Sequence, residues 1–215
     1  MLSYARPSRD RTSNEEPVEK LLRDLNYELG HYVKGHTEAL PGAFDQDMPL
    51  GTVWKRRLSR MLADSEVLIP LVSRPFLASE WCGKEWWVFS QRPVTVRPPL
   101  EPGEQAIVPV IWRPVPEDEI HPVVRNLRYD NSGMPPSYGA HGLLALSRGS
   151  AGAAGDYQAA VNRIAKRVGD LLLYATVEPG QMVNLDTAPN AFQRTQPSWE
   201  GVRFWHGDQD DADRT

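Results

Sequence analysis

The feature that most constrains the fold is a continuous apolar run at residues 67–72, which directly follows a segment of helical character. Such a run is typical of a strand buried on both faces of a parallel sheet, and Ser-Arg-Pro at residues 73–75 ends it. A second apolar run covers residues 106–112, and residues 79–91 between the two runs have a helical pattern. Because parallel strands are joined through crossover helices, we expect a doubly wound α/β sheet with helices on both sides.

Three other segments have apolar residues at helical spacing, namely residues 16–30, 54–65 and 157–174. A weaker strand is expected at residues 123–128, and a long polar loop connects it to the last of these helices. The length of 215 residues fits one domain with a well-buried core plus an extra segment. We therefore expect a single α/β domain.

The character of the chain changes after this domain, which we place at residues 1–176. Residues 177–215 form a polar tail, and the composition near its end is typical of disordered segments. Trp199, Phe204 and Trp205 are exceptions, because aromatic residues in a polar tail usually dock on something. Two roles for the tail stay open. It could cover a ligand-binding cleft of the domain, or it could recruit a protein partner.

Composition and charge argue against several classes of protein. No stretch approaches the run of about 18 apolar residues that spans a membrane, and the start lacks the organisation of a secretion signal. We expect a cytoplasmic protein without membrane contact. One cysteine excludes an internal disulfide, and five scattered histidines make no zinc-ligand spacing, so we expect no metal. A net charge of −4 argues against a nucleic-acid-binding surface.

Three motifs resemble those of Toll/interleukin-1 receptor (TIR) domains. Leu-Ser-Tyr-Ala-Arg at residues 2–6 is similar to the family's first strand. Residues 42–54, with Gly-Ala-Phe-Asp and Gly-Thr-Val-Trp, resemble the loop after the second strand (the BB loop) and the following helix. Residues 73–86 contain the signature Ser-x-Trp-Cys-x-x-Glu. The resemblance covers residues 1–175 and implies a flavodoxin-like, mainly parallel five-stranded sheet.

Within the family, residues 81–86 and 106–112 are most similar to a bacterial, chiefly actinobacterial, TIR-like group that includes FxsC-type proteins. Two features depart from the family pattern. Only Met1 and Leu2 precede Ser3, so that the first strand is shortened or the true start lies upstream. The second strand, at residues 36–40, lacks the apolar run of the other strands.

Glu85 is the candidate catalytic residue. Trp81, Glu85 and Phe89 are four residues apart on the expected helix, which places the carboxylate between two aromatic rings. Burial there would favour a neutral carboxyl, whereas a cationic ligand such as the nicotinamide ring of NAD would favour the carboxylate. The resemblance implies that Glu85 cleaves the nicotinamide–ribose bond. Nicotinamide leaves as a neutral molecule and needs no acid, so one carboxylate that stabilises positive charge or holds a ribose hydroxyl suffices.

The resemblance also implies NAD-binding residues around Glu85. Tyr4 and Arg6 follow the first strand, at the edge where doubly wound sheets bind ligands, and a guanidinium suits pyrophosphate. Phe44 and Asp45 belong to the bordering loop, and Trp81 is placed to stack on a ring. There is no Gly-rich dinucleotide fingerprint, so NAD as substrate rests on the resemblance.

Each assignment has a plainer alternative. Glu85 could be a helix-surface carboxylate paired with a nearby Lys or Arg, and Trp81 a packing residue. Arg6 could lie in solvent, Phe44 could anchor its loop or an assembly contact, and Cys82 is most simply a small packed residue. Two functions follow. One is an assembly-activated enzyme that hydrolyses or cyclises NAD, as in antiphage defence. The other is a non-catalytic TIR module that self-associates through its BB loop, as an accessory to peptide maturation.

Overall fold

A computed structural model describes residues 1–5, 12–33, 53–127, 133–149 and 154–193. The elements are, in chain order, β1 (Leu2–Ser3), α1 (Thr12–Tyr32), α2 (Val53–Asp64), β2 (Ile69–Val72), α3 (Arg74–Ala78), α4 (Glu80–Ser90), β3 (Val94–Val96), β4 (Val110–Ile111), α5 (Pro122–Arg125), α6 (Pro136–Ser147), α7 (Ala154–Tyr174) and β5 (Ala175–Val177), with a 3-10 turn at Glu117–Glu119.

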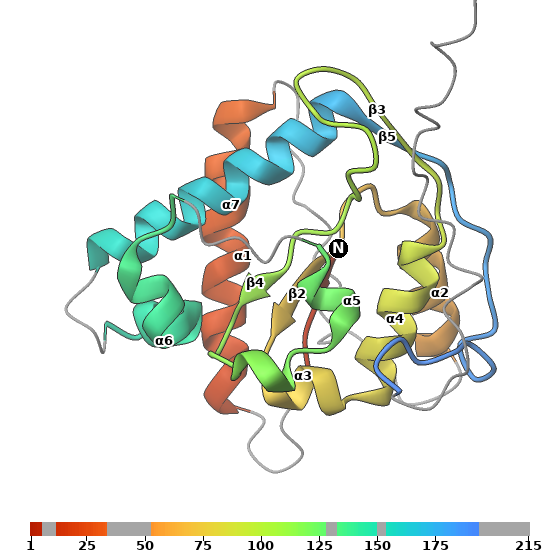
Figure 1. Cartoon of the computed structure of the whole chain (residues 1–215), viewed down its shortest axis with the longest axis horizontal. Helices are drawn as coiled ribbons and strands as arrows, with labels where there is room; N and C mark the ends of the chain where they lie inside the picture. Colours follow the sequence, from red (N-terminus) through yellow and green to blue (C-terminus); the bar gives the residue numbers. More distant parts are fainter. Residues whose placement is uncertain (6–11, 34–52, 128–132, 150–153, 194–215) are drawn as a thin grey trace, which may run out of the picture.

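The central sheet has the order β1-β2-β4 in the described part of the chain, and its neighbouring strands are parallel (Figure 1). Leu2 is opposite Ile69, and Leu71 is opposite Val110. The two apolar runs of the sequence therefore form adjacent parallel strands, as their composition predicts. The expected second strand at residues 36–40 lies outside the described residues, and the described residues form a central sheet of three parallel strands where five were expected.

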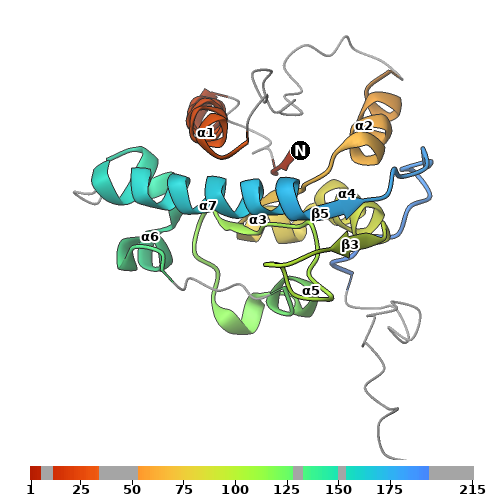
Figure 2. The ribbon, with the colours of Figure 1, turned by 90° about the horizontal axis from the view of Figure 1, so that it is seen from above.

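Alternation along residues 68–72, which include β2, divides the core between the two faces of the sheet. Ile69 and Leu71 belong to one buried cluster, whereas Leu68 and Val72 belong to the other. The first cluster includes the apolar faces of α1, α6 and α7, and the second includes those of α2 and α4. Figure 1 shows these two groups of helices on opposite sides of the strands, and in Figure 2 the first group lies toward the left and the second toward the right. Since successive strand residues point to opposite faces, one apolar run serves both layers.

The helices expected from apolar spacing are confirmed as α1, α2, α4 and α7. Their apolar positions are buried, and α1 packs along α7. No helix in the described residues is long and apolar enough to cross a membrane.

The prediction of a strand at residues 123–128 is wrong, because the chain forms α5 there. His121 accepts a hydrogen bond from the N–H of Val123 through Nδ1, at 3.4 Å, and Pro122 occupies the first helical turn. Proline is compatible with this position because the N–H that it lacks would have no intrahelical partner. The two adjacent valines suggested a strand, whereas the cap and the proline start a helix.

The prediction of a long polar loop before residue 157 is also wrong, because this segment contains α6. Gly142 interrupts this helix with a φ of 76°, and an added Cβ there would lie 2.7 Å from the carbonyl oxygen of Trp112. The close approach of α6 to the end of β4 requires a glycine, which obscures the helical periodicity. The short helix α3 was likewise not expected, and Ser73 caps it by accepting from the N–H of Phe76 at 3.3 Å.

The described chain continues past β5 along the outside of the domain. β5 pairs antiparallel with β3, separately from the central sheet. We call residues 178–193 the strap. Hydrogen bonds join its first half to α2 and its second half to α4, and its side chains Leu185 and Phe192 are buried with the second core cluster. The aromatic residues Trp199, Phe204 and Trp205 lie outside the described residues.

Candidate functional site

Glu85 is positioned by the helix start that its own motif encodes. The Ser79 hydroxyl accepts a hydrogen bond from the N–H of Cys82 at 3.3 Å, which caps α4 one and a half turns before Glu85. Serine is among the preferred residues at this position because its oxygen satisfies an N–H that the helix leaves unpaired. The Glu85 side chain is half-buried on this helix.

Ser3 of β1 holds the Glu85 carboxylate. The Ser3 hydroxyl donates a hydrogen bond to Oε2 of Glu85, and Ser3 is only 2% exposed. The last residue of β1 is thereby linked to the middle of α4. A hydrogen bond to a charged acceptor is stronger than one between neutral groups, so this contact orients the carboxylate. Sequence reasoning did not identify Ser3 as this partner, although it lies in the first TIR-like motif.

Cys82 lies beside the same carboxylate and is buried. Burial, followed by the negative charge of Glu85, raises the pKa of the Cys82 thiol to about 12. Both effects disfavour the thiolate. At neutral pH the thiol is therefore protonated and is not a nucleophile, which agrees with its interpretation as a packed residue.

Trp81 is already in contact with several groups of the protein. Its ring meets that of Trp54 edge-on, with 4.6 Å between the centroids. The ammonium groups of Lys84 and Lys55 lie over it, 5.1 Å and 5.6 Å from its centroid. Phe89, the other aromatic residue of the stripe, is buried in the core, so Trp81 is the ring of the stripe that remains partly exposed.

Of the remaining predicted site residues, Tyr4 is the one that lies within the described part of the chain. Tyr4 follows Ser3 and packs, partly buried, against the first core cluster. Arg6, Phe44 and Asp45 lie outside the described residues. Glu85 thus contacts Ser3, which directly precedes Tyr4 in the chain. Trp81 lies one turn before Glu85 on α4.

The strap contacts α4 on the turn that precedes Glu85. The N–H of Ala191 donates to the carbonyl oxygen of Gly83 at 3.1 Å. A Cβ added to Gly83 would lie 1.6 Å from Oδ1 of Asn190, so the close packing of these two segments requires a glycine. Lys84 donates to the carbonyl oxygen of Asp186 at 3.2 Å. Two consecutive residues of the motif therefore hold the strap.

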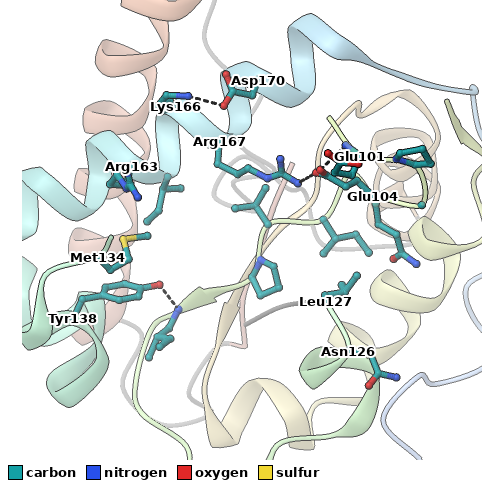
Figure 3. A pocket seen from close by; sticks show the side chains of 18 residues that line it. Glu101, Glu104, Asn126, Leu127, Met134, Tyr138, Arg163, Lys166, Arg167 and Asp170 are labelled. Carbon is teal, nitrogen blue, oxygen red and sulfur yellow. Dashed lines mark hydrogen bonds and ion pairs between the residues drawn. The ribbon is translucent and has the colours of Figure 1, made fainter. Parts of the chain in front are cut away.

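A cavity of about 590 Å³ lies along β4, between α7 and residues 101–109 (Figure 3). The N–H of Ile111 donates to the Tyr138 hydroxyl at 2.8 Å, while the N–H of Trp112 donates to β2. Tyr138 therefore provides the hydrogen-bond acceptor for the N–H of Ile111, on the edge of β4 that faces away from β2. Arg167 pairs with Glu104 across this cavity, and neither Glu85 nor Trp81 lines it.

A second cavity, of about 740 Å³, lies beyond the carboxyl ends of β2 and β4. Arg74 forms a two-bond ion pair with Glu119 at 2.6 Å on its rim, and Phe192 of the strap contributes to its wall. It too is lined by neither Glu85 nor Trp81. No group of three or more potential metal ligands occurs among the described residues.

A family model described as TIR domain matches residues 1–132. Comparison with curated proteins and with solved structures gives no match. The matched region includes β1, α4 and β4, and thus both Ser3 and Glu85, whereas α6, α7 and the strap follow it.

Proposed function

The chain belongs to the TIR-domain family, whose model matches more than half of its 215 residues, and on that premise we propose that it cleaves NAD. The proposed reaction breaks the bond between nicotinamide and ribose, and Glu85 is the catalytic residue. The hydrogen bond from buried Ser3 to Glu85 supports this assignment most directly, because it holds a half-buried carboxylate beside the end of a central strand. Ligands of doubly wound sheets bind at that edge.

The proposed chemistry needs one carboxylate. When the C–N bond breaks, its electron pair leaves with nicotinamide, which departs neutral, and positive charge develops on the ribose. The Glu85 carboxylate stabilises that charge or accepts a hydrogen bond from a ribose hydroxyl. Water then adds to the sugar carbon and loses a proton, or a nucleophile of the same molecule closes a ring. Cys82 takes no part, because its raised pKa keeps the thiol neutral.

The other proposed contacts are inherited from the family resemblance. In this proposal Tyr4, Arg6, Phe44, Asp45 and Trp81 bind NAD, and no metal takes part. TIR domains commonly self-associate, and we propose that assembly activates this one in the cytoplasm for defence or signalling. The tail, residues 177–215, is proposed to recruit a protein partner.

A second candidate function is a non-catalytic scaffold similar to the actinobacterial FxsC-type group. The hydrogen bond between Ser3 and Glu85 also favours it, because a carboxylate tied to a buried strand residue can serve to fasten α4 to the sheet. In that case assembly through the BB loop would be the whole function. Shared fold does not separate the two functions, so turnover must.

The test measures loss of NAD and release of nicotinamide by concentrated protein, with and without assembly-promoting crowding agents. We expect turnover by the wild type and its loss in Glu85→Gln, which keeps the shape of the side chain and removes its charge. Glu117→Gln, at an exposed carboxylate of the 3-10 turn, is the matched control and should retain turnover. Absence of turnover under every condition would contradict the proposed reaction and favour the scaffold function. Equal turnover in Glu85→Gln and Glu117→Gln would show that Glu85 takes no part in the mechanism.

A further inference from the structure

Two lysines and two tryptophans gather where α2 and α4 begin. Trp54 and Lys55 lie in the first turn of α2, and Trp81 and Lys84 lie in the first turns of α4. Both ammonium groups lie within 5.6 Å of the centroid of Trp81, whose ring also contacts Trp54. Indole rings provide stacking surface and ammonium groups attract anions, so this set has the chemistry that recognises a phosphate next to an aromatic base.

The position of these residues is favourable for a ligand. α2 leads into the amino end of β2, so its first turn lies toward the carboxyl edge of the sheet. α4 follows the carboxyl end of β2 through α3, and its first turn lies at the same edge. That is the edge at which doubly wound sheets bind nucleotides.

Asp186 of the strap occupies this cluster. Its carboxylate lies 2.5 Å from Nζ of Lys55, and its backbone carbonyl oxygen accepts from Nζ of Lys84 at 3.2 Å. A local turn presents the residue, since Oδ1 of Asn184 accepts from the N–H of Asp186 at 3.0 Å. An acidic residue on a preformed turn thus satisfies the two lysines from outside the family-matched region.

The charge balance shows what the removal of Asp186 would leave. Lys84 is only 6% exposed, and the carboxylate paired with it is that of Glu80, at 2.7 Å, whose side chain is 64% exposed; Asp186 contacts Lys84 through its neutral backbone carbonyl group. Within the described residues, Glu80 and Asp186 are the carboxylates paired with the two lysines. Without Asp186, two cations beside two indole rings would face one carboxylate, and the cluster would carry a net positive charge.

We propose that Lys55, Lys84, Trp54 and Trp81 form a binding site for a nucleotide phosphate and base, and that Asp186 occupies it as an internal competitor. The consequence for activity rests on the proposed NAD cleavage, because NAD carries both groups that this site recognises. The strap then restrains turnover until its 184–187 turn is displaced. The site itself requires no bond cleavage and can be tested without turnover.

The experiment measures ADP binding to the full chain by calorimetry at low ionic strength, for the wild type and for Asp186→Asn. The substitution removes one exposed competing charge, whose ion pair is of the kind that contributes up to about 1 kcal/mol, so we expect ADP affinity to rise about three- to fivefold. Adding Lys55→Ala to Asp186→Asn should remove the gain. Raising the salt concentration should reduce it, because exposed charges are screened.

Asp170→Asn is the matched control, since it breaks an exposed ion pair with Lys166 on α7, at 2.8 Å, and should leave ADP affinity unchanged. An equal ADP affinity of wild type and Asp186→Asn, with both folded by circular dichroism, would overturn the proposal. So would a gain that survives Lys55→Ala. If Asp186→Asn does not fold, Lys55→Ala alone decides, because it should weaken ADP binding in the wild-type background.

The result is separable from the proposed reaction. Adding Glu85→Gln to Asp186→Asn should retain the gain in ADP affinity, because Glu85 is not part of this site. A gain in ADP affinity without any NAD cleavage would support the proposed binding site and contradict the proposed reaction. Glu85-dependent cleavage with no gain in ADP affinity, and no rise in turnover in Asp186→Asn, would uphold the reaction and remove the site.

Discussion

The hydroxyl of Ser3 on β1 donates a hydrogen bond to the carboxylate of Glu85 on α4, across a sequence separation of 82 residues. The pair joins the first and third TIR-like motifs, which are far apart in the chain. Because Ser3 is buried in the central sheet, it fixes one oxygen of Glu85 relative to that sheet. This contact gives the carboxylate a defined orientation.

Ser3→Ala should lower NAD turnover with little change in KM. The substitution removes a hydrogen bond to a charged group, which contributes about 1.5 to 3 kcal/mol, and the expected loss in kcat is at least about tenfold. Steady-state kinetics measures both constants. Ser59→Ala is the matched control, because Ser59 is equally buried and bonds Val183 instead. A similar loss of kcat in Ser59→Ala would assign the effect to stability and not to orientation.

Gly83→Ala should detach the strap from α4. The new methyl group would overlap Oδ1 of Asn190, and that oxygen is already held by the N–H of Phe192 at 2.9 Å. We expect faster hydrogen exchange in residues 184–193 than in the wild type. Gly30→Ala in α1 is the control, since nothing lies within 4 Å of its new Cβ and alanine is the better helix former. An unchanged exchange rate in Gly83→Ala would contradict the observed packing.

Cys82 should resist alkylation in the folded protein. A thiol pKa near 12 leaves about a thousandfold less thiolate at pH 8 than an unperturbed cysteine has, and the thiolate is the reactive form. Iodoacetamide labelling, followed by mass spectrometry, should be slow in buffer and fast in denaturant. Since the folded pKa lies above the ordinary value of 9.0, this thiol favours the folded state below pH 9 and loses that contribution between about pH 9 and 12. Rapid labelling in buffer would contradict its burial.

Arg92→Ala should destabilise the junction between α2 and the strap. The guanidinium donates to the carbonyl oxygens of Leu62 at 2.8 Å and Glu178 at 2.9 Å, and also to that of Ser65. Without it, one buried and two partly buried carbonyl groups lose this partner, at a cost of about 2 to 3 kcal/mol. Urea unfolding measures the change. Arg92→Lys should recover only part of the loss, because an ammonium group lacks the planar fork that reaches all three oxygens.

The sequence predicted the fold well where periodicity is strong. Buried parallel strands must be apolar on both sides, and residues 67–72 and 106–112 show this pattern without help from the rest of the chain. The long helices followed from apolar residues on one face. The strand expected at residues 123–128 was wrong because two valines carried more weight than a capping histidine and a proline, which act through local hydrogen bonding.

By itself, the sequence determined the α/β alternation and the family and singled out Glu85 as the candidate catalytic residue, because these depend on local periodicity and on motifs that are read in order. Only the tertiary structure decided the surroundings of Glu85. The contact with Ser3, the close fit of Asn190 on Gly83 and the placement of Asp186 between two lysines all join residues that are remote in the chain. Such contacts depend on how strands and helices pack in three dimensions, and no local pattern records which distant residue will face which.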